Sequence, residues 1–392
     1  MAQAPARIRK IDADSHFLPQ SDFGDLSQVL KGFSQGQLEI IIRDALVFAD
    51  PNARRGGFRA TAAGQRLNAG GGGDGTAGAA VGGGAPRRAT GPVGHGTALD
   101  RAKLLPETGF DTQVLIPDGI FANPFGAPGM REWEPGLRLA LCVAYNNATS
   151  AAQKQCPEEF IGTAIVPFFD VEESCREATR AVRELGLRAI TINGNWVGKN
   201  WDSIELFPFW KTVSDLGAVL YVHHNPFACT VNDHRPTTYT LGHERMRRLH
   251  ISNYLGFAFE YMMGMASLTL GGVLEEYPDL KFCFFEAGGS WLPWVMYTLD
   301  RTYNVERQCA RCTTLPSELI RKSSLVAVEP DETPIVGAIH MIGSENFIIG
   351  SDYPHPPSTY PNTAAGLESM VGLSQQDKDN IMGLNVAKFL GV

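Results

Sequence analysis

The chain contains no long hydrophobic run, since none of its apolar stretches approaches the roughly 18 consecutive apolar residues that a membrane-spanning helix needs. Its first seven residues, MAQAPAR, also lack the apolar core of a secretory signal. These two absences argue against a membrane protein and against export. We therefore expect a cytoplasmic protein with no membrane partner.

An excess of positive charge is also absent. The 392 residues include 34 Lys and Arg against 42 Asp and Glu, which gives a formal net charge of −8. Because nucleic-acid binding depends on basic surfaces that neutralise phosphates, this balance argues against nucleic acid as a partner.

Cysteine is sparse, with seven residues that show no repeated metal-type spacing. One Cys-x-x-Cys pair, Cys309 and Cys312, could be a redox or zinc pair, but no second pair completes a four-thiolate site. We therefore expect reduced, structural thiols.

Short β-rich runs alternate with helical stretches along most of the chain, a pattern typical of βα units that build a parallel sheet. Candidate strands lie at residues 7–12, 112–116, 160–167, 188–192, 218–222, 281–285, 324–328 and 346–350. Candidate helices lie at residues 136–153, 171–185, 204–216, 254–277, 291–305 and 375–389. Eight strands in this alternation predict an α/β fold, a distorted (β/α)8 TIM barrel, with residues 1–392 forming a single domain.

One segment, at about residues 51–96, is dominated by Gly, Ala, Arg and Thr and cannot bury enough apolar surface to fold independently. We expect it to be a long loop inserted after the first βα unit, near the catalytic rim of the barrel. It is either a lid or a solvated insertion. Its arginines could pair with a substrate carboxylate, but the sequence singles out none of them.

Four polar motifs stand at the ends of hydrophobic runs. They are DADSH at 12–16, VHH at 222–224, FEAGG at 285–289 and GSDYPH at 350–355. The carboxyl ends of parallel strands meet at one end of an α/β barrel, which is where such barrels keep their chemistry. Carboxylates and imidazoles gathered there are typical of a divalent metal site.

The first motif supplies three candidate ligands. Because side chains alternate along an extended segment, we expect Asp12, Asp14 and His16 to share one face. Two adjacent members of this set can then bind one ion. A helix cap is the alternative interpretation.

Histidines end the second motif. His223 closes a strand-like run, where its neutral imidazole can supply a nitrogen ligand, and a hydrogen-bonded core histidine is the alternative. His224 points the other way if the strand persists, so we assign it to the pocket wall or to proton transfer. His250 belongs to a second irregular region, residues 224–253, whose histidines and arginines either form surface salt bridges or act in catalysis.

Carboxylates end two further strands. Asp352 follows the last strand, where it can bind the ion and accept a proton, and the prolines after it argue against a helix cap. His355 lies just beyond and can support it. Glu286 emerges from an almost wholly apolar strand, so it needs a cation or a proton partner. It can be a further metal ligand, a general acid or base, or an acceptor that holds His223.

The four motifs, together with EAGGSWLP at 286–293 and NVAK at 385–388, resemble the amidohydrolase superfamily. The most similar branch contains aminocarboxymuconate semialdehyde decarboxylase and the hydroxybenzoate decarboxylases. The resemblance covers nearly the whole chain outside the glycine-rich insertion. It implies a distorted TIM barrel that holds one divalent ion, Zn²⁺ or Mn²⁺. Because such relatives are commonly dimers or tetramers, we also expect a homo-oligomer.

The resemblance implies metal ligands at Asp14, His16, His223 and Asp352. The chain departs from the family pattern in two places. Asp14 stands where the fullest pattern has a histidine, and an oxygen ligand there favours manganese or another hard ion. Glu286 stands where the decarboxylases generally carry a proton-moving histidine. Either Glu286 or a histidine between 234 and 250 takes over that role, or the reaction differs.

These observations lead to the hypothesis of a metal-dependent lyase that decarboxylates a cyclic or aromatic acid without oxidation, with Asp352 or Glu286 handling the proton. A hydrolase of C–C, amide or ester bonds that uses metal-activated water is the first alternative. A catalytically inactive metal-binding scaffold is the second. Aromatic residues expected near the rim, such as Trp196, Trp201 and Trp291, favour a ring-bearing small-molecule substrate.

Overall fold

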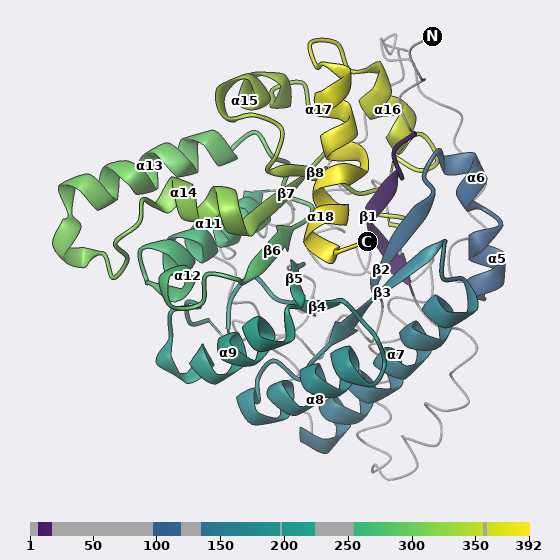
Figure 1. Ribbon diagram of the computed structural model, residues 1–392, viewed down its shortest axis with the longest axis horizontal. Coiled ribbons are helices and arrows are strands. Elements are labelled where there is room, and N and C mark those ends of the chain that lie inside the picture. Colours follow the sequence, from purple (N-terminus) through teal and green to yellow (C-terminus); the bar gives the residue numbers. More distant parts are fainter. Residues whose placement is uncertain (1–6, 18–96, 119–134, 197, 224–254, 356–358) are drawn as a thin grey trace, which may run out of the picture.

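A computed structural model describes residues 7–17, 97–118, 135–196, 198–223, 255–355 and 359–392 (Figure 1). Eight parallel strands form one sheet in chain order. They are β1 (Ile11–Phe17), β2 (Thr112–Pro117), β3 (Phe160–Ile165), β4 (Ala189–Ile192), β5 (Val219–Val222), β6 (Lys281–Phe284), β7 (Ser324–Val328) and β8 (Phe347–Ile349). This order, with each strand beside the next, confirms the predicted α/β barrel.

The sheet closes where β1 meets the segment that follows β8. The Asp14 carbonyl accepts hydrogen bonds from the backbone N–H groups of Ser351 (3.1 Å) and Asp352 (3.0 Å). The N–H of His16 donates to the carbonyl of Tyr353 (2.7 Å). Residues from the two ends of the chain are therefore joined by backbone hydrogen bonds at this seam.

Helices surround the strands (Figure 1). The α-helices are α5 (Ala98–Ala102), α6 (Leu105–Thr108), α7 (Pro135–Gln155), α8 (Val171–Arg183), α9 (Phe207–Leu216), α11 (Leu255–Thr269), α12 (Val273–Glu276), α13 (Leu292–Val305), α14 (Pro316–Ser323), α15 (Ile335–Ile342), α16 (Thr363–Ser369), α17 (Gln375–Asp379) and α18 (Asn385–Leu390). Two 3₁₀ turns, η3 (Ile204–Leu206) and η6 (Arg307–Cys309), and one π-helical turn, η7 (Asn380–Leu384), complete the elements.

The predicted helices are all present, but the one expected at 254–277 is divided into α11 and α12, and the one expected at 375–389 consists of α17, η7 and α18. The first division lies between Thr269 and Val273, where Gly272 precedes α12 with a φ of +85°, outside the helical range. Helices α5, α6, α14, α15 and α16 were not predicted from the sequence. Each of these has eight residues or fewer, too short for a clear helical period.

The apolar core has an inner and an outer layer. The inner layer contains the strand residues Ala13 and Tyr221 and also Phe285, just after β6, with Val386 and Leu390 of α18 packed against them. Figure 1 shows α18 lying across the middle of the ring of strands. Because α18 contacts the beginnings of the strands, the open end of the barrel is the one where the strands finish.

Helix α18 is fixed to the sheet by a side chain at the start of β4. The Arg188 guanidinium donates to the carbonyls of Leu390 and Gly391, at 3.1 Å each. In the part of the chain that the structure describes, no helix combines the length and apolarity needed to cross a membrane. The glycine-rich segment at 51–96 lies outside the described residues, and the single-domain organisation stays a prediction.

The first strand differs from its predicted position. We expected it at 7–12, but β1 occupies Ile11–Phe17 and all seven of its residues are buried. The prediction was wrong because the strand was expected to end at Asp12, and the polar residues Asp14 and His16 were taken to follow it rather than to form it. They tolerate burial because each has polar neighbours in the interior.

Candidate metal centre

The ends of four strands bring five polar side chains together. Asp14 and His16 lie on β1, and His223 directly follows β5. Glu286 lies two residues beyond β6, and Asp352 lies three residues beyond β8. The structure therefore gathers these five candidates at one end of the barrel, while the roles assigned to them stay predictions.

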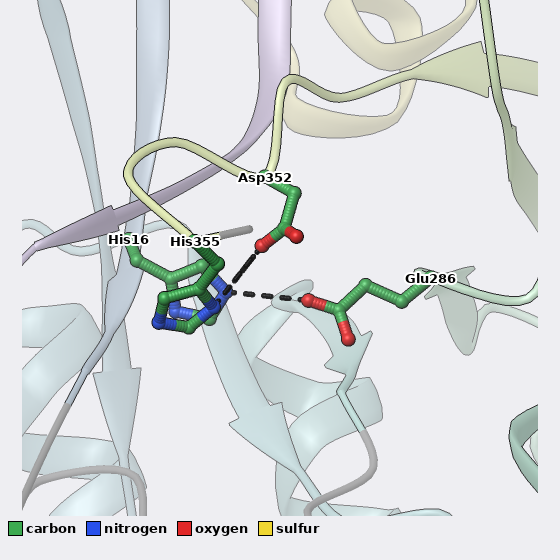
Figure 2. Close-up of side chains that lie close together, drawn as sticks. All are labelled: His16, Glu286, Asp352 and His355. Atoms are coloured by element: carbon green, nitrogen blue, oxygen red, sulfur yellow. Dashed lines mark ion pairs between the residues drawn. The ribbon is translucent and has the colours of Figure 1, made fainter. Parts of the chain in front are cut away.

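His16 lies at the centre of the group. Its Nε2 atom is 3.3 Å from Oδ1 of Asp352, 3.5 Å from Oε1 of Glu286 and 3.9 Å from Oδ1 of Asp14. Figure 2 shows the two carboxylates of Asp352 and Glu286 pointing toward this nitrogen from different elements. The same Glu286 oxygen is 3.0 Å from Nε2 of His223. One ligand atom from each residue therefore faces the same small volume.

The tautomer of His16 follows from its neighbour on β2. Its Nδ1 atom lies 3.0 Å from the backbone carbonyl oxygen of Pro117, which can only accept a hydrogen bond. A neutral ring therefore carries its proton on Nδ1, and its Nε2 lone pair is directed at the carboxylates. This is the arrangement by which a backbone carbonyl orients a metal-binding histidine.

Three buried atoms of the group lack a hydrogen-bond partner among the described residues. They are Oδ1 of Asp14, Nε2 of His16 and Oδ1 of Asp352. Nitrogens of His16 and His355 approach the last atom at 3.3 Å and 3.1 Å, but not along the direction of a hydrogen bond. Leaving such atoms buried without hydrogen bonds is costly, so three of them facing one another fit the binding of a cation. Two imidazoles and three carboxylates fit one divalent ion, and the oxygen-rich set favours a hard ion such as Mn²⁺.

The five side chains differ in their access to solvent. Asp14 and His16 have side-chain exposures of only 3% and 2%, so they form the floor of the centre. Asp352 is 19% exposed and Glu286 is 21% exposed. Of the five, these two carboxylates and the 12% exposed His223 are the ones that can touch a molecule that enters the barrel mouth.

The backbone is strained at two of the five positions. Among the described residues, Glu286 (φ +59°) and Asp352 (φ +52°) are the only non-glycine residues with a positive φ. Each such conformation costs about 1–3 kcal/mol and persists only where the surroundings impose it. Close packing contributes at Gly350, where a Cβ atom would lie 2.3 Å from the Cβ of Asp14.

The pKa values reflect the crowding of like charges. Burial, reinforced by Glu286 and Asp352, raises the pKa of Asp14 to about 7, although His16 and His223 lower it. Burial lowers the pKa of His16, but the adjoining Asp352, Glu286 and Asp14 carboxylates hold it well above its ordinary value. The Glu286 pKa lies well below its usual range because His223 and His16 outweigh the effect of burial. The site therefore holds protons where it lacks a metal cation.

A further histidine, His355, lies against the ring of His16. The rings of His355 and His16 have centroids 3.8 Å apart. Nδ1 of His355 is 3.1 Å from Oδ1 of Asp352, and its Nε2 is 3.1 Å from Oδ1 of Asp118. Burial and His16 lower the pKa of His355, but Asp118 and Asp352 raise it to about 9. His355 thus bridges two carboxylates from opposite sides of the seam.

Two carboxylates near the centre were missed by the sequence analysis. Asp118 directly follows β2, and Glu329 directly follows β7. Desolvation together with Asp352 and Glu286 raises the pKa of Glu329 to about 8, although part of its side chain is exposed. Both follow predicted strands in the same way as Glu286, and that shared position was the signal that could have identified them.

Asp12 does not share a face with Asp14 and His16, which corrects the sequence expectation. The pairing of β1 with β2 shifts between Asp12 and Ser15, so strict alternation fails there. The Asp12 carboxylate instead accepts hydrogen bonds from Ser351 N (2.8 Å), Ser351 Oγ (2.7 Å) and Gln113 Nε2 (3.1 Å). It belongs to a buried polar network beside the centre.

Arg101 of α5 completes this network. Its Nε donates to Oε1 of Gln113 (3.0 Å), its Nη2 donates to Oγ of Ser15 (2.6 Å), and its Nη1 donates to the His16 carbonyl. The guanidinium also lies over the ring of Tyr353 at 5.2 Å. The network therefore connects the backbone of His16 to the segment that carries Asp352.

Other predicted participants are not part of the described site. His224 and His250 lie outside the described residues, as do the arginines of the glycine-rich segment. Trp201, expected near the rim, is fully buried and stacks on Phe282 at 5.8 Å, so that prediction was wrong. Its apolar surroundings and its distance along the chain from the strand end explain its place in the core.

An eight-stranded α/β barrel with this mouth defines a TIM-barrel protein suited to hold a divalent ion. The chain belongs to the amidohydrolase family, because the family model described as amidohydrolase matches residues 11–392. It is 29% identical over 262 residues to 2-amino-3-carboxymuconate-6-semialdehyde decarboxylase from Dictyostelium discoideum, covering 66% of this chain and 68% of that protein. The predicted family and branch are thereby confirmed.

Solved structures share the fold. One is 5-carboxyvanillate decarboxylase from Sphingomonas paucimobilis, with a TM-score of 0.68 and 16% identity over 98% of this chain and 100% of that chain. Another is a dihydroxybenzoic acid decarboxylase from Polaromonas sp. with bound manganese and the inhibitor 2-nitroresorcinol. Its TM-score is 0.64 at 17% identity, over 98% of this chain and 97% of that chain.

Proposed function

We propose that the protein is a metal-dependent, non-oxidative decarboxylase of an aromatic or other cyclic carboxylic acid. The observation that carries this proposal is the set of buried ligand atoms without hydrogen bonds on Asp14, His16 and Asp352, with the partly exposed carboxylate of Glu286 beside them. Two of the related decarboxylases are named for ring-bearing acids, dihydroxybenzoic acid and 5-carboxyvanillate, and the Polaromonas structure holds manganese, which supports the same chemistry here.

The proposed metal ligands are Asp14, His16, His223 and Asp352, with Mn²⁺ favoured over Zn²⁺ because Asp14 supplies an oxygen ligand where the fullest family pattern has a histidine. When bound, a divalent ion supplies positive charge that attracts the substrate carboxylate and a neighbouring oxygen. The buried pair Asp14 and His16 cannot touch the substrate and serves only to hold the ion.

Proton transfer is assigned to Asp352 or Glu286, the two carboxylates exposed at the mouth. Asp352 is the better donor, because His223 and His16 keep the pKa of Glu286 low and its carboxylate ionised. Asp352 is ionised while it serves as a ligand, so it takes up a proton from solvent before the step and gives that proton to the ring carbon that bears the substrate carboxylate. The C–C bond to that carboxylate then breaks, its electron pair returns to the ring, and CO₂ leaves. Asp352 is then ionised again.

Glu286 has the complementary role of a fixed negative charge beside the two histidines. His224 and His250 stay predicted proton carriers. In this proposal Glu286 occupies the position at which the decarboxylases generally carry a histidine after strand six. Asp352 performs the proton transfer assigned to that histidine.

The test is CO₂ release by Mn²⁺-loaded protein from hydroxybenzoic, carboxyvanillic and related ring-bearing acids. We expect release from at least one acid, loss of activity after chelation, and recovery when Mn²⁺ is restored. Hydrolysis of an ester, amide or C–C bond without CO₂ release would identify the hydrolase alternative. Bound metal without turnover of any of these compounds would favour the inactive scaffold.

We infer a cytoplasmic homo-oligomer, a dimer or tetramer, that binds a small organic acid and neither nucleic acid nor membrane. The net charge of −8 supports the absence of a nucleic-acid partner. Light scattering coupled to size-exclusion chromatography measures the oligomeric state directly.

A further inference from the structure

We propose that Glu332 is a positioning residue, which holds the loop after β6 and thereby fixes the Glu286 carboxylate against His16 and His223. The role of Glu286 in the metal centre rests on the proposed function. The contact between Glu332 and the loop is independent of that function, since it is a set of hydrogen bonds within the chain.

The Glu332 carboxylate is surrounded by donors from the loop. Its Oε1 accepts hydrogen bonds from the backbone N–H of Gly289 (3.0 Å), the backbone N–H of Ser290 (2.7 Å) and the Ser290 hydroxyl (2.5 Å). Its Oε2 accepts from Gly289 N (3.0 Å) and from the backbone N–H of Glu329 (3.2 Å). One side chain therefore joins the loop after β6 to the loop after β7.

The loop needs such support because its backbone is strained. Glu286 has a φ of +59° and Gly288 a φ of +61°, and no strand pairing extends beyond Phe284 to hold them. Glu332 also packs closely here, since a Cβ on Gly288 would lie 2.9 Å from Glu332 Oε1. A strained turn of this kind persists only where outside contacts impose it.

The position of Glu286 depends on that turn. Its Oε1 lies 3.0 Å from Nε2 of His223 and 3.5 Å from Nε2 of His16, the two nitrogens proposed to bind the ion. A displacement of about 1 Å is enough to disrupt an active-site arrangement of this kind. Within the described residues, Glu332 itself has no hydrogen bond or ion pair with the five side chains of the centre, so it acts through the loop.

Three variants separate this role from a general loss of charge. Glu332→Gln keeps the size of the side chain but turns one acceptor oxygen into an amide donor that faces backbone N–H groups. Asp331→Asn makes the same charge change one residue away, at an exposed side chain without a hydrogen bond in the described structure. Ser290→Ala is the milder variant, since it removes only the hydroxyl donor and leaves the backbone contacts.

The first measurement is the crystal structure of each variant without metal. We expect the distance from Glu286 Oε1 to His223 Nε2 to lengthen in Glu332→Gln, to lengthen less in Ser290→Ala, and to stay at 3.0 Å in Asp331→Asn. An unchanged distance in both loop variants overturns the proposal. If Glu332→Gln does not fold, the result for Ser290→Ala decides.

The second measurement is the dissociation constant for Mn²⁺, with the metal alone as the probe. We expect Glu332→Gln to weaken binding by roughly 10-fold to 100-fold, as for other residues that orient ligands, and Asp331→Asn to have no effect. The double variant Glu332→Gln, Glu286→Gln should bind no more weakly than Glu286→Gln alone. Additive losses would show that Glu332 does not act through Glu286. A wild-type protein that binds no Mn²⁺ would reject the proposed metal site, while the crystal structures would still decide the role of Glu332.

Discussion

The Nε2 atom of His16 lies 3.3 Å from Oδ1 of Asp352, across the seam where the first strand meets the segment after the last. The Asp14 carbonyl binds the N–H groups of Ser351 and Asp352 at the same seam. The hydrogen bonds that close the barrel therefore also set the distance between two proposed ligands. Because the same hydrogen bonds determine both, a change to the seam should affect the closure of the barrel and the positions of the proposed ligands together.

Replacing Asp352 with Asn should abolish catalysis while leaving the fold intact. The amide keeps the shape of the side chain but cannot donate a carboxyl proton, and general acid catalysis contributes roughly 10²-fold to 10⁴-fold to a rate. We expect kcat to fall by at least that range, with an unfolding temperature close to that of the wild type. CO₂ release measures the first and calorimetry the second. Wild-type activity in this variant would remove Asp352 from the mechanism.

A methyl group at Gly350 should damage the seam. Its Cβ would lie 2.3 Å from the Cβ of Asp14, so one of the two segments must move, at a cost of about 1–3 kcal/mol. We expect Gly350→Ala to be less stable in urea unfolding and to bind Mn²⁺ more weakly. Gly337→Ala on α15 is the matched control, since no atom lies within 4 Å of its added Cβ. Equal behaviour of the two variants would show that the close approach has no consequence.

Loss of the Arg101 guanidinium should destabilise the buried network. Arg101→Met removes the donors to Gln113, Ser15 and the His16 carbonyl and leaves Asp12 without its nearby positive charge. Removing one partner from a buried charged group costs about 3–5 kcal/mol. Arg183→Met, at an exposed position on α8, should change the free energy of unfolding by no more than about 0.5 kcal/mol. A small effect at Arg101 would mean that water replaces the guanidinium.

The stability of the metal-free protein should fall as the pH rises from 6.5 to 9. Burial lowers the pKa values of His16 and His355, but the neighbouring carboxylates raise the first well above 6.5 and the second to about 9. A histidine whose pKa is higher in the folded protein than in the unfolded chain stabilises the fold. This contribution is complete at a pH below the pKa of the unfolded chain, and it is lost as the pH rises through the pKa of the folded protein. We expect calorimetry to show a falling unfolding temperature across this range.

Adding Mn²⁺ provides the control for the pH experiment. Metal ligands must be deprotonated, so the ion should raise the unfolding temperature more at pH 9 than at pH 6.5. A metal-free protein whose stability is constant or rises between these values would contradict the proton-holding cluster described above.

Much of the barrel could be predicted from the sequence because its inner strands are apolar runs between turn residues. The candidates at their ends, His223 and Glu286, could be identified from position alone. The first strand could not, because Asp12 and Asp14 are buried polar residues whose partners come from the other end of the chain. A shift in strand pairing is likewise invisible in the sequence, so the separate environment of Asp12 was missed.

Contacts between distant loops were also beyond prediction. The hydrogen bonds that Gly289 and Ser290 donate to Glu332 depend on the distance between two neighbouring loops, and no sequence pattern marks them. Asp118 could have been found, since it follows a predicted strand, but its pairing with His355 depends on the closure of the barrel.

The most direct test of the metal centre is the metal content of the purified protein, compared with that of the Asp14→Ala, His223→Ala double variant. We predict about one equivalent of manganese or zinc per chain in the wild type, and none in the variant, because two of the proposed ligands are gone. Equal metal content in the two proteins, or no metal in the wild type after reconstitution, would contradict the account.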